Sequence, residues 1–315
     1  MKAPLLKVEN LKQHFEISKK FTVKAVDGVS FEIYPGEVFG LVGESGSGKS
    51  TIGRSVIRLY EPTAGRITFD GMDVSGKLSH ETNKRLRTGM QMIFQDPMAC
   101  LNPRKKVSDI IAQGLDIHHL YRSKKERDEK VAHILEEVGL APEHASRYPH
   151  QFSGGQRQRI GIARALIMNP RLIIADECIS ALDVSIQAQV VNLMKDIQQN
   201  TGCAYLFIAH DLSMVKYISD RIGVLHLGHM VETGTREEIF SRPVHPYTRS
   251  LLSAIPHPNP VVEKKRVAMT YNYKEYGVDY LKGADHLVEG THHVLATDEE
   301  FAKWTGETAE RHLPV

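Results

Sequence analysis

The sequence has little cysteine, no long apolar run and almost no net charge. Its three cysteines, Cys100, Cys178 and Cys203, are far apart and include no C-x-x-C pair. We therefore expect neither a disulfide framework nor a cysteine zinc site, and a reducing cytosolic setting fits. A formal net charge of +2 gives no indication of a basic nucleic-acid-binding face, so no nucleic-acid partner is predicted.

Membrane segments are also missing from the sequence. No stretch approaches the roughly 20 apolar residues that span a bilayer, and the charged amino terminus lacks the apolar run of a signal peptide. The 315 residues are 41% hydrophobic and 25% charged, as in a soluble globular protein with one large domain or a domain with an extension. If the protein works at a membrane, another chain must supply the part that crosses it.

The hydrophobic pattern divides the chain into regions of different secondary structure. Alternating strands are predicted at Leu6–Ile17, Val23–Ile33, Glu37–Val42 and Arg66–Phe69. The pattern predicts later strands at Leu172–Ala175, Tyr205–Ala209 and Arg221–Leu227, and helices at Lys124–Val138, Gly155–Met168, Ile186–Gln198 and Met214–Ile218. Short apolar strands between helices predict a buried, largely parallel α/β sheet. Prolines cluster after Arg242, which we interpret as the edge of the main domain.

A glycine-rich segment that matches G-x-x-x-x-G-K-[ST] lies between a predicted strand and a predicted helix. It consists of Gly43, Glu44, Ser45, Gly46, Ser47, Gly48, Lys49, Ser50 and Thr51. Glycines let backbone N–H groups surround phosphate oxygens, and the helix dipole favours the same anion. Lys49 is expected to reach the β- and γ-phosphates of ATP, and Ser50 to ligate Mg²⁺. The alternative, a glycine-rich turn with a surface lysine, does not explain the strand and helix on either side.

Two adjacent carboxylates, Asp176 and Glu177, end an apolar strand. Phosphoryl transfer needs an acid that holds Mg²⁺, here Asp176, and a group that polarises the attacking water, here Glu177. Seen alone, such a pair could simply cap a core strand at its solvent end. Gln95 and His210 also follow short apolar strands, and either one alone is more typical of a surface polar residue.

Between the phosphate loop and the acidic strand lies Ser153-Gly154-Gly155-Gln156, and Ser180-Ala-Leu-Asp183 follows the acidic strand. In this order, the motifs resemble those of the nucleotide-binding subunits of ABC transporters over roughly residues 5 to 235. The resemblance implies a P-loop NTPase fold, with a RecA-like core, an antiparallel β subdomain and a helical subdomain at about residues 97–165. The cassette would comprise residues 1–241, and residues 242–315 would be a C-terminal extension.

The resemblance also implies roles for individual residues. Phe15 would stack on adenine, Gln95 would sense the γ-phosphate and the metal, and Asp183 would lie in a loop between subunits. Glu177 would be the catalytic base and His210 would contact the γ-phosphate and the water. Ser153, Gly154, Gly155 and Gln156 would contact ATP bound to the opposite subunit. Phe152 and Cys178 depart from the common leucine and proline, but neither change removes a catalytic group.

The C-terminal stretch from His245 to Pro256 is similar to that of the peptide and nickel uptake branch, and the tail Gly290–Trp304 resembles oligopeptide permease F-type subunits of Gram-positive bacteria. This resemblance implies an importer subunit on the cytoplasmic face of the plasma membrane. Its partners would be a paralogous D-type ATP-binding subunit, two transmembrane permease subunits and an extracellular peptide-binding protein. The helical insertion, roughly 97–151, would receive a cytoplasmic helix of the permease. Because no cysteine follows Cys203, no iron–sulfur centre is predicted.

Other functions remain as alternatives. A dipeptide or nickel importer would use the same cassette, and a soluble ABC ATPase would usually add a second cassette or a long coiled coil. A small-molecule kinase would not account for Ser153–Gln156. The histidine pairs 118–119 and 292–293 lack nearby ligand partners in the sequence, so we expect solvated surface residues rather than metal sites. Glu263–Arg266 is expected to be a solvated linker.

Overall fold

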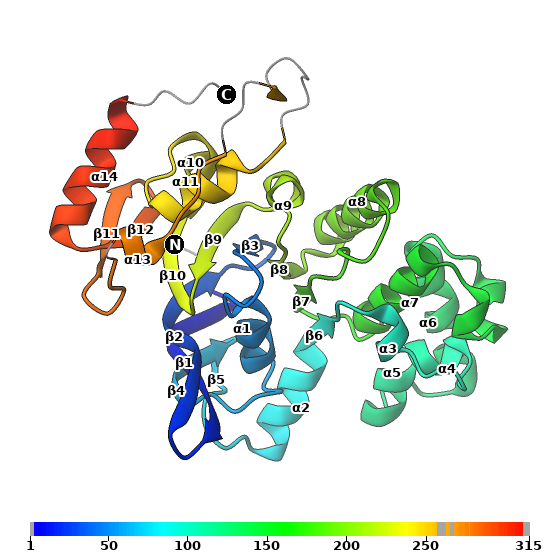
Figure 1. The fold of residues 1–315 in the computed structure, drawn as a ribbon. Helices are drawn as coiled ribbons and strands as arrows, with labels where there is room; N and C mark the ends of the chain where they lie inside the picture. Colours follow the sequence, from blue (N-terminus) through cyan, green and yellow to red (C-terminus); the bar gives the residue numbers. More distant parts are fainter. Residues whose placement is uncertain (1–2, 257–262, 265–267, 277, 311–315) are drawn as a thin grey trace.

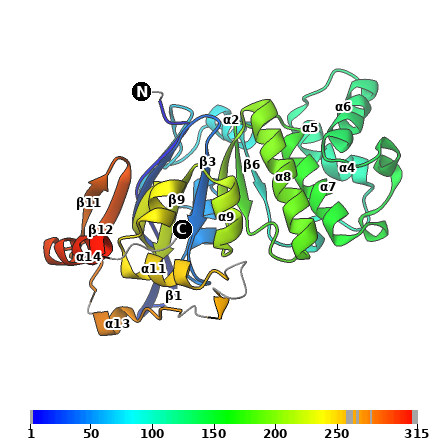
Figure 2. The same ribbon diagram turned by 90° about the horizontal axis from the view of Figure 1, so that it is seen from above.

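The computed structural model describes residues 3–256, 263–264, 268–276 and 278–310. Two sheets form the body of the protein, and a helical lobe lies to one side of them (Figures 1 and 2). The larger sheet has the strand order β11-β12-β10-β9-β3-β8-β7-β6, and the smaller one has the order β2-β1-β4-β5. The mixed α/β class and the separate antiparallel sheet confirm the predicted fold class.

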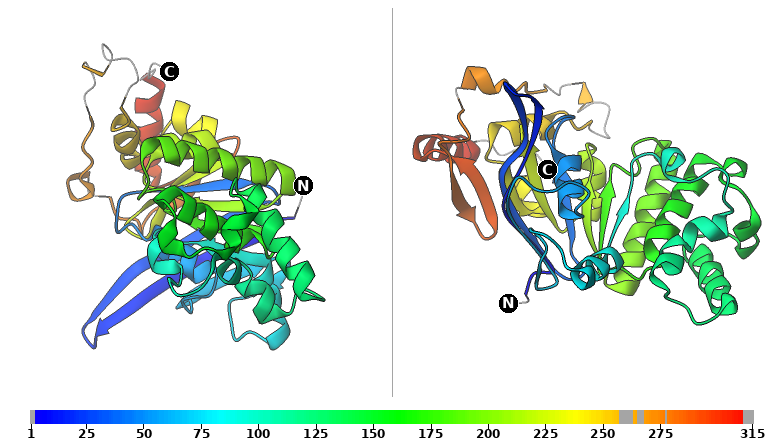
Figure 3. Two further views of the ribbon diagram at one scale, coloured as in Figure 1. Left: turned by 90° about the vertical axis from the view of Figure 1, so that its right-hand side faces the viewer. Right: turned by 90° about the horizontal axis from the view of Figure 1, so that it is seen from below.

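Strands that pair with their neighbours in antiparallel fashion form the smaller sheet. Its members are β1 (Leu6–Ser18), β2 (Phe21–Ile33), β4 (Ala64–Phe69) and β5 (Met72–Asp73). One face of β1 and β2 is buried, and this agrees with the alternation in the sequence. The β1–β2 hairpin extends away from the body, as Figure 3 shows.

Short parallel strands form the larger sheet from β9 to its edge at β6. They are β3 (Val38–Val42), β6 (Met90–Ile93), β7 (Leu172–Asp176), β8 (Ala204–Ile208) and β9 (Arg221–His226). Every residue of β3, β7 and β8 is buried, which explains why their sequences are apolar without alternation. Parallel pairing places the carboxyl ends of β3 and β7 at the same edge of the sheet, only one strand apart.

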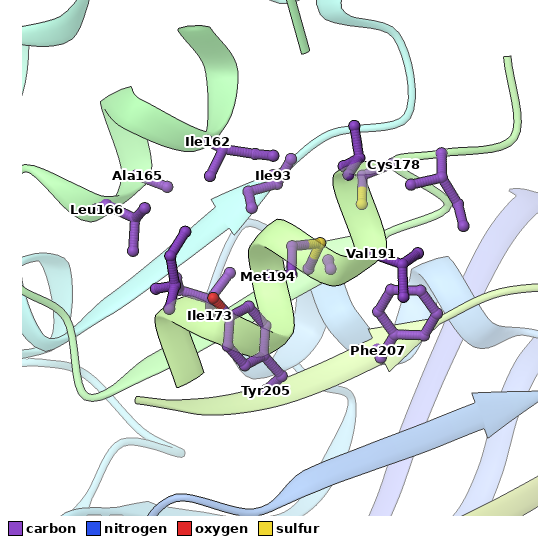
Figure 4. Packing of buried hydrophobic residues seen from close by; sticks show 14 of the residues in the cluster. Ile93, Ile162, Ala165, Leu166, Ile173, Cys178, Val191, Met194, Tyr205 and Phe207 are labelled. Carbon is purple, nitrogen blue, oxygen red and sulfur yellow. The ribbon is translucent and has the colours of Figure 1, made fainter. Parts of the chain in front are cut away.

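Most of the helical lobe lies between β6 and β7 in the sequence. It contains α3 (Pro97–Cys100), α4 (Val107–Ile111), α5 (Gln113–His118), α6 (Lys124–Glu137), two 3₁₀ turns (Pro142–Ser146 and Pro149–Gln151) and α7 (Gly154–Leu166). Figure 4 shows the apolar layer that joins α7 and α8 (Val184–Thr201) to the sheet. Met194, Ile173 and Phe207 belong to this layer, and the lobe therefore shares one core with the sheet.

Four further helices before Arg242 cover the sheet and its edges. They are α1 (Lys49–Val56), α2 (His80–Gly89), α9 (Leu212–Ile218) and α10 (Arg236–Ser241). The sequence pattern groups Leu59 with Ile52 and Val56 on one apolar side, but α1 ends at Val56. Arg58 then adopts a left-handed φ of 62°, and Leu59 is 49% exposed. The expectation that Leu59 lies on the apolar side of this helix is wrong, because the helix ends three residues before it.

The C-terminal part returns to the larger sheet. Its elements are β10 (His229–Thr235), α11 (Pro246–Ser253), α13 (Tyr273–Tyr276), β11 (Ala284–Glu289), β12 (His292–Ala296) and α14 (Asp298–Glu310). Strand β12 pairs with β10, so the β11–β12 hairpin continues the sheet that contains β3. The linker Glu263–Arg266 falls largely outside the described residues, which include only Glu263 and Lys264 of it.

The expectation of solvated histidine pairs is wrong for His292. Its side chain is buried, and its Nε2 lies 2.7 Å from the buried Glu232 carboxylate. His293 is half-buried beside Asp285, whereas His119 is exposed. The partner of His292 lies 60 residues away in sequence, on the neighbouring strand, so no local spacing could indicate it. None of the helices in the described ranges is long and apolar enough to cross a membrane.

Candidate nucleotide-binding and hydrolysis site

The phosphate loop connects the buried strand β3 to helix α1, as the motif requires. Gly43 and Gly48 have φ values of 150° and 107°, a region that side chains disfavour. A Cβ at Gly43 would lie 2.1 Å from the carbonyl oxygen of Leu225, and one at Gly48 would lie 2.3 Å from that of Ala25. The loop is therefore held close to Leu225, near the end of β9, and to Ala25, within β2, where only glycine fits.

Lys49 is the first residue of α1, and its ammonium group lies inside the loop. The Nζ donates to the carbonyl oxygens of Gly43 and Glu44 at 2.7 and 2.8 Å. Burial lowers the pKa of Lys49, and the negative charges of Glu177 and Asp176 oppose that shift. Neutral carbonyls stabilise a buried ammonium group less than an anion does. A phosphate group would therefore be a stronger partner for Lys49.

Ser50 and Asp176 meet at the edge where β3 and β7 end. The Ser50 hydroxyl donates to Asp176 Oδ1 at 2.6 Å. Asp176 Oδ2 is buried without a hydrogen bond among the described residues, and the Arg54 guanidinium lies 3.6 Å from it. Burial raises the pKa of Asp176, an effect that the Ser50 hydrogen bond and Arg54 reduce. Sequence reasoning missed Arg54, because an arginine on the exposed side of a helix carries no distinguishing signal.

Glu177 directly follows β7 and is held in an unusual backbone conformation. Its φ is 46°, and such left-handed non-glycine residues are often found at functional sites. Its backbone N–H donates to the carbonyl of Ile208, and the Ser180 hydroxyl donates to the Glu177 carbonyl. The carboxylate lies 3.9 Å from Lys49 Nζ and accepts from Gln95 Nε2 at 3.0 Å. The structure thus brings together Gln95, Lys49 and Glu177 from three separate segments.

His210 follows β8 and lies near the same carboxylate. His210 and Glu177 both line a small pocket, together with Ser180 and Asp211. The Asp211 side chain caps α9 by accepting the backbone N–H of Ser213 at 2.8 Å, so the chain direction after His210 is fixed. Cys178 points the other way, into the core, and burial raises the pKa of its thiol to about 12. Such a thiol stays protonated and unreactive.

The Ser153–Gln156 motif begins α7 in the helical lobe, away from the phosphate loop of the same chain (Figure 1). Ser153 accepts the Gln156 backbone N–H, and the Gln156 side chain accepts that of Ser153, which forms a capping box. Ser153 and Gly154 are exposed, whereas Phe152 is buried in the lobe. The start of α7 could thus bind, through its backbone N–H groups, an anion that is held by another molecule.

The two other sequence-predicted residues are Phe15 and Asp183. Phe15 is half-buried on β1, opposite Val23 on β2, and its ring packs edge-on against Tyr60 at 5.4 Å between centroids. Asp183 precedes α8 and is exposed.

The phosphate loop, the two carboxylates after β7 and the polar residues after β6 and β8 define a P-loop ATPase of the cassette type. Comparison with known proteins agrees. The ABC transporter family matches residues 26–180, and the C-terminal region of oligopeptide/dipeptide transporters matches residues 231–275. The chain belongs to the ATP-binding proteins of the ABC transporter family.

Individual relatives extend over almost the whole chain. The oligopeptide transport ATP-binding protein OppF of Bacillus subtilis is 58% identical over 305 residues, which cover 96% of this chain and 99% of that protein. The dipeptide transport ATP-binding protein DppF of Lactococcus lactis is 56% identical and covers 85% and 86%. Among solved structures, the dimeric cassette MJ0796 bound to ADP and Pi has a TM-score of 0.67 at 28% identity. It covers 73% of this chain and 98% of MJ0796.

Proposed function

We propose that this protein is the ATP-hydrolysing subunit of an ABC importer that energises oligopeptide uptake. The observation that carries the proposal is the extent of similarity: 58% identity to an oligopeptide transport ATP-binding protein includes the C-terminal region as well as the cassette. A cassette fold alone would support ATP hydrolysis but no particular cargo. The proposed location is the cytoplasmic face of the plasma membrane, where the protein is bound to permease subunits.

The residues after β3 and β7 fit a magnesium ion that accompanies ATP. Ser50 and Asp176 offer hard oxygen donors, and Asp176 Oδ2 is buried with no hydrogen bond from the described residues. Ser50 and Asp176 would hold Mg²⁺, Asp176 either directly or through a water molecule, and Gln95 would add an amide oxygen. The ion would neutralise charge on the β- and γ-phosphates.

Each side chain then has a defined task in hydrolysis. Lys49 exchanges its two carbonyl partners for phosphate oxygens, which are stronger acceptors for a buried ammonium group. Glu177 accepts the proton of the attacking water, because its carboxylate is already oriented by Gln95. His210 contacts the γ-phosphate and the water from the other side of the pocket that it shares with Glu177. Phe15 stacks on the adenine ring.

A second cassette completes the site. Ser153 and Gly154 are exposed, and the motif that they begin lies in the helical lobe, away from Lys49. One chain therefore contributes a phosphate loop to one nucleotide and a helix start to another. The partner is a paralogous D-type ATP-binding subunit rather than a second copy. Two ATP molecules would lie between the subunits, and the isolated chain would hydrolyse ATP poorly.

The permease contact is supported by an open, apolar hollow between the helical lobe and the sheet. Leu59, Met92 and Phe94 line it from one side, and Ile117 and Met168 from the other. Leu59 and Ile117 are 49% and 63% exposed, and they share one hollow with other apolar side chains instead of being scattered singly. A cytoplasmic helix of a transmembrane permease subunit would cover them, and an extracellular binding protein would deliver the peptide.

A dipeptide or nickel importer is the second candidate, because a dipeptide transport relative is 56% identical. A test that separates these cargoes reconstitutes the chain with its permeases and binding protein in proteoliposomes. We expect uptake of a labelled oligopeptide that depends on ATP and is lost in a Glu177→Gln complex. Uptake of only a labelled dipeptide or ⁶³Ni²⁺ would reassign the cargo. Recovery of the chain only on ribosomes or DNA would refute the importer.

A further inference from the structure

One peptide group at the start of the phosphate loop is held from both sides. The carbonyl of Gly43 accepts from Lys49 Nζ at 2.7 Å, and the N–H of Glu44 donates to the Tyr247 hydroxyl at 2.9 Å. These two groups belong to the same planar trans amide, so they point in opposite directions. Lys49 and Tyr247 together therefore fix the rotation of the Gly43–Glu44 peptide.

Tyr247 comes from α11, 203 residues beyond the loop that it contacts. It is buried, and its backbone N–H donates to Nδ1 of His245, the residue that caps α11. Pro246 occupies the first turn of the helix, where its missing N–H costs nothing. The rings of Tyr247 and His226 lie 4.1 Å apart between centroids, which leaves the Tyr247 side chain little freedom.

Glu232 holds the start of α11 in place. Its buried carboxylate accepts the backbone N–H of Val244 at 2.7 Å and that of His245 at 3.0 Å. The same group lies 2.7 Å from Nε2 of His292 on β12. Three donors satisfy one buried acid, and they connect β10, β12 and the helix that carries Tyr247. The C-terminal hairpin is thus linked through Glu232 to α11, the helix whose Tyr247 contacts the phosphate loop.

Arg249 holds the other side of α11. Its guanidinium donates to the carbonyl oxygens of Pro243 and Trp304 at 3.1 and 2.6 Å, and it pairs with Glu307 at 2.9 Å. Trp304 and Glu307 lie on α14, so the last helix is bonded to α11. The helix is fixed at two points, and Tyr247 projects from it toward the loop.

We infer that Tyr247 is a positioning residue for ATP binding, through which the C-terminal extension holds the phosphate loop in its binding conformation. Lys49 must leave the Gly43 carbonyl when it turns to the phosphates. Among the described residues, the Tyr247 hydroxyl is then the remaining side-chain hydrogen-bond partner of this peptide. Without it, the Gly43–Glu44 peptide can rotate, and only a fraction of the molecules would be ready to bind. This inference rests on the proposed function only for the turnover measurement. The binding measurements do not depend on transport.

The test compares Tyr247→Phe with Tyr205→Phe in the full chain. Tyr205, on β8, is also fully buried, and its hydroxyl has no hydrogen-bond partner in the described part of the chain, so it is a matched control. ATP affinity is measured by calorimetry with Mg²⁺, and amide hydrogen exchange is measured for a peptide that includes Glu44. Thermal unfolding establishes that both variants fold.

Tyr247→Phe is expected to raise the Kd for ATP about five- to tenfold, the factor that one net hydrogen bond is worth. It should speed exchange of the Glu44 peptide, while Tyr205→Phe changes the Kd less than about twofold. In the reconstituted transporter, KM should rise with kcat nearly unchanged, because Glu177 and Gln95 are untouched. A Kd for Tyr247→Phe equal to that of wild type, even with lower stability, would overturn the inference. A wild-type complex that binds ATP without hydrolysing it would count against the proposed function. The Kd values of the two variants would still decide whether Tyr247 positions the loop.

Discussion

The Gln95 side chain donates a hydrogen bond from Nε2 to Glu177 Oε2 at 3.0 Å, across 82 residues of sequence. The two residues follow β6 and β7, which are adjacent and parallel, so their side chains meet at the same edge of the sheet. The bond gives the Glu177 carboxylate a fixed direction before any water reaches it. A general base needs such an orientation, because proton transfer depends on geometry before pKa.

Glu177→Gln should stop turnover and keep ATP binding. The amide has the same shape as the carboxylate but cannot accept the proton of water, so hydrolysis should fall about a hundred- to ten-thousandfold. The ATP-bound variant should accumulate as the closed dimer with its partner subunit, visible by size-exclusion chromatography. Exposed Glu129 on α6 offers a control in Glu129→Gln, which should hydrolyse normally. Full hydrolysis by Glu177→Gln would remove this residue from the role of base.

Lys49→Ala should weaken ATP binding. The ammonium is the one cation of the phosphate loop itself, and loss of a hydrogen bond to a charged group costs about 1.5–3 kcal/mol. We expect the Kd from calorimetry to rise at least tenfold. Lys125→Ala, at a side chain that is 86% exposed in the helical lobe, should bind ATP as wild type does. Unchanged affinity in Lys49→Ala would contradict the phosphate-loop assignment.

Stability should decrease as the pH falls below about 6.5, because burial lowers the pKa of His245 to about 3 and that of His226 to about 4. Between the unfolded and folded pKa values, the unfolded chain binds protons that the folded one excludes. Each such histidine then removes about 1.4 kcal/mol per pH unit. Nearby Arg249 adds to the effect on His245.

The variant His245→Asn separates this contribution, because asparagine also caps helices but does not titrate in this range. Urea unfolding at pH 7, 6, 5 and 4 measures the slope. The loss of unfolding free energy per pH unit should be smaller in the variant by about 1.4 kcal/mol. Parallel pH profiles for the variant and the wild type would show that His245 is not buried in its neutral form.

Tyr205→Phe should increase stability. The Tyr205 hydroxyl lies among apolar side chains such as Ile173 and Met194, as Figure 4 shows, and it has no hydrogen-bond partner among the described residues. A buried polar group without a partner costs about 1–3 kcal/mol, so its removal should raise the free energy of unfolding by about 1 kcal/mol. Urea unfolding measures the change. A loss of stability would indicate that the hydroxyl has a partner that matters to the fold.

The local motifs made most of the site predictable. Each of Lys49, Asp176, Glu177 and His210 follows a strand or begins a helix that its own neighbours in sequence specify. Parallel strands bring such ends together, which is why motif order alone indicated that these residues of the candidate site would meet. Hydrophobic patterns also predicted the buried strands to within a few residues, since a run such as Leu172–Asp176 cannot face water.

The long-range contacts were not predictable. Tyr247 reaches Glu44 across 203 residues, and His292 meets Glu232 across 60. Neither pair has a spacing that one sequence can reveal, because each depends on the position of a strand or helix relative to the whole sheet. The pairing of β12 with β10 has the same origin. His292 therefore resembled a surface residue in sequence, although it is 1% exposed.

The central claim is that one chain holds only half of an ATP site. The most direct test measures the hydrolysis rate per chain as a function of concentration, with and without the partner cassette and permeases, for the wild type and Ser153→Arg. Ser153 is exposed at the start of α7, so the substitution should block the partner's nucleotide without unfolding the lobe. We predict a low rate for the isolated chain, a large increase on assembly, and loss of much of that increase in the variant. A dilute chain that hydrolyses at its full rate alone, and equally well with Ser153→Arg, would contradict the account.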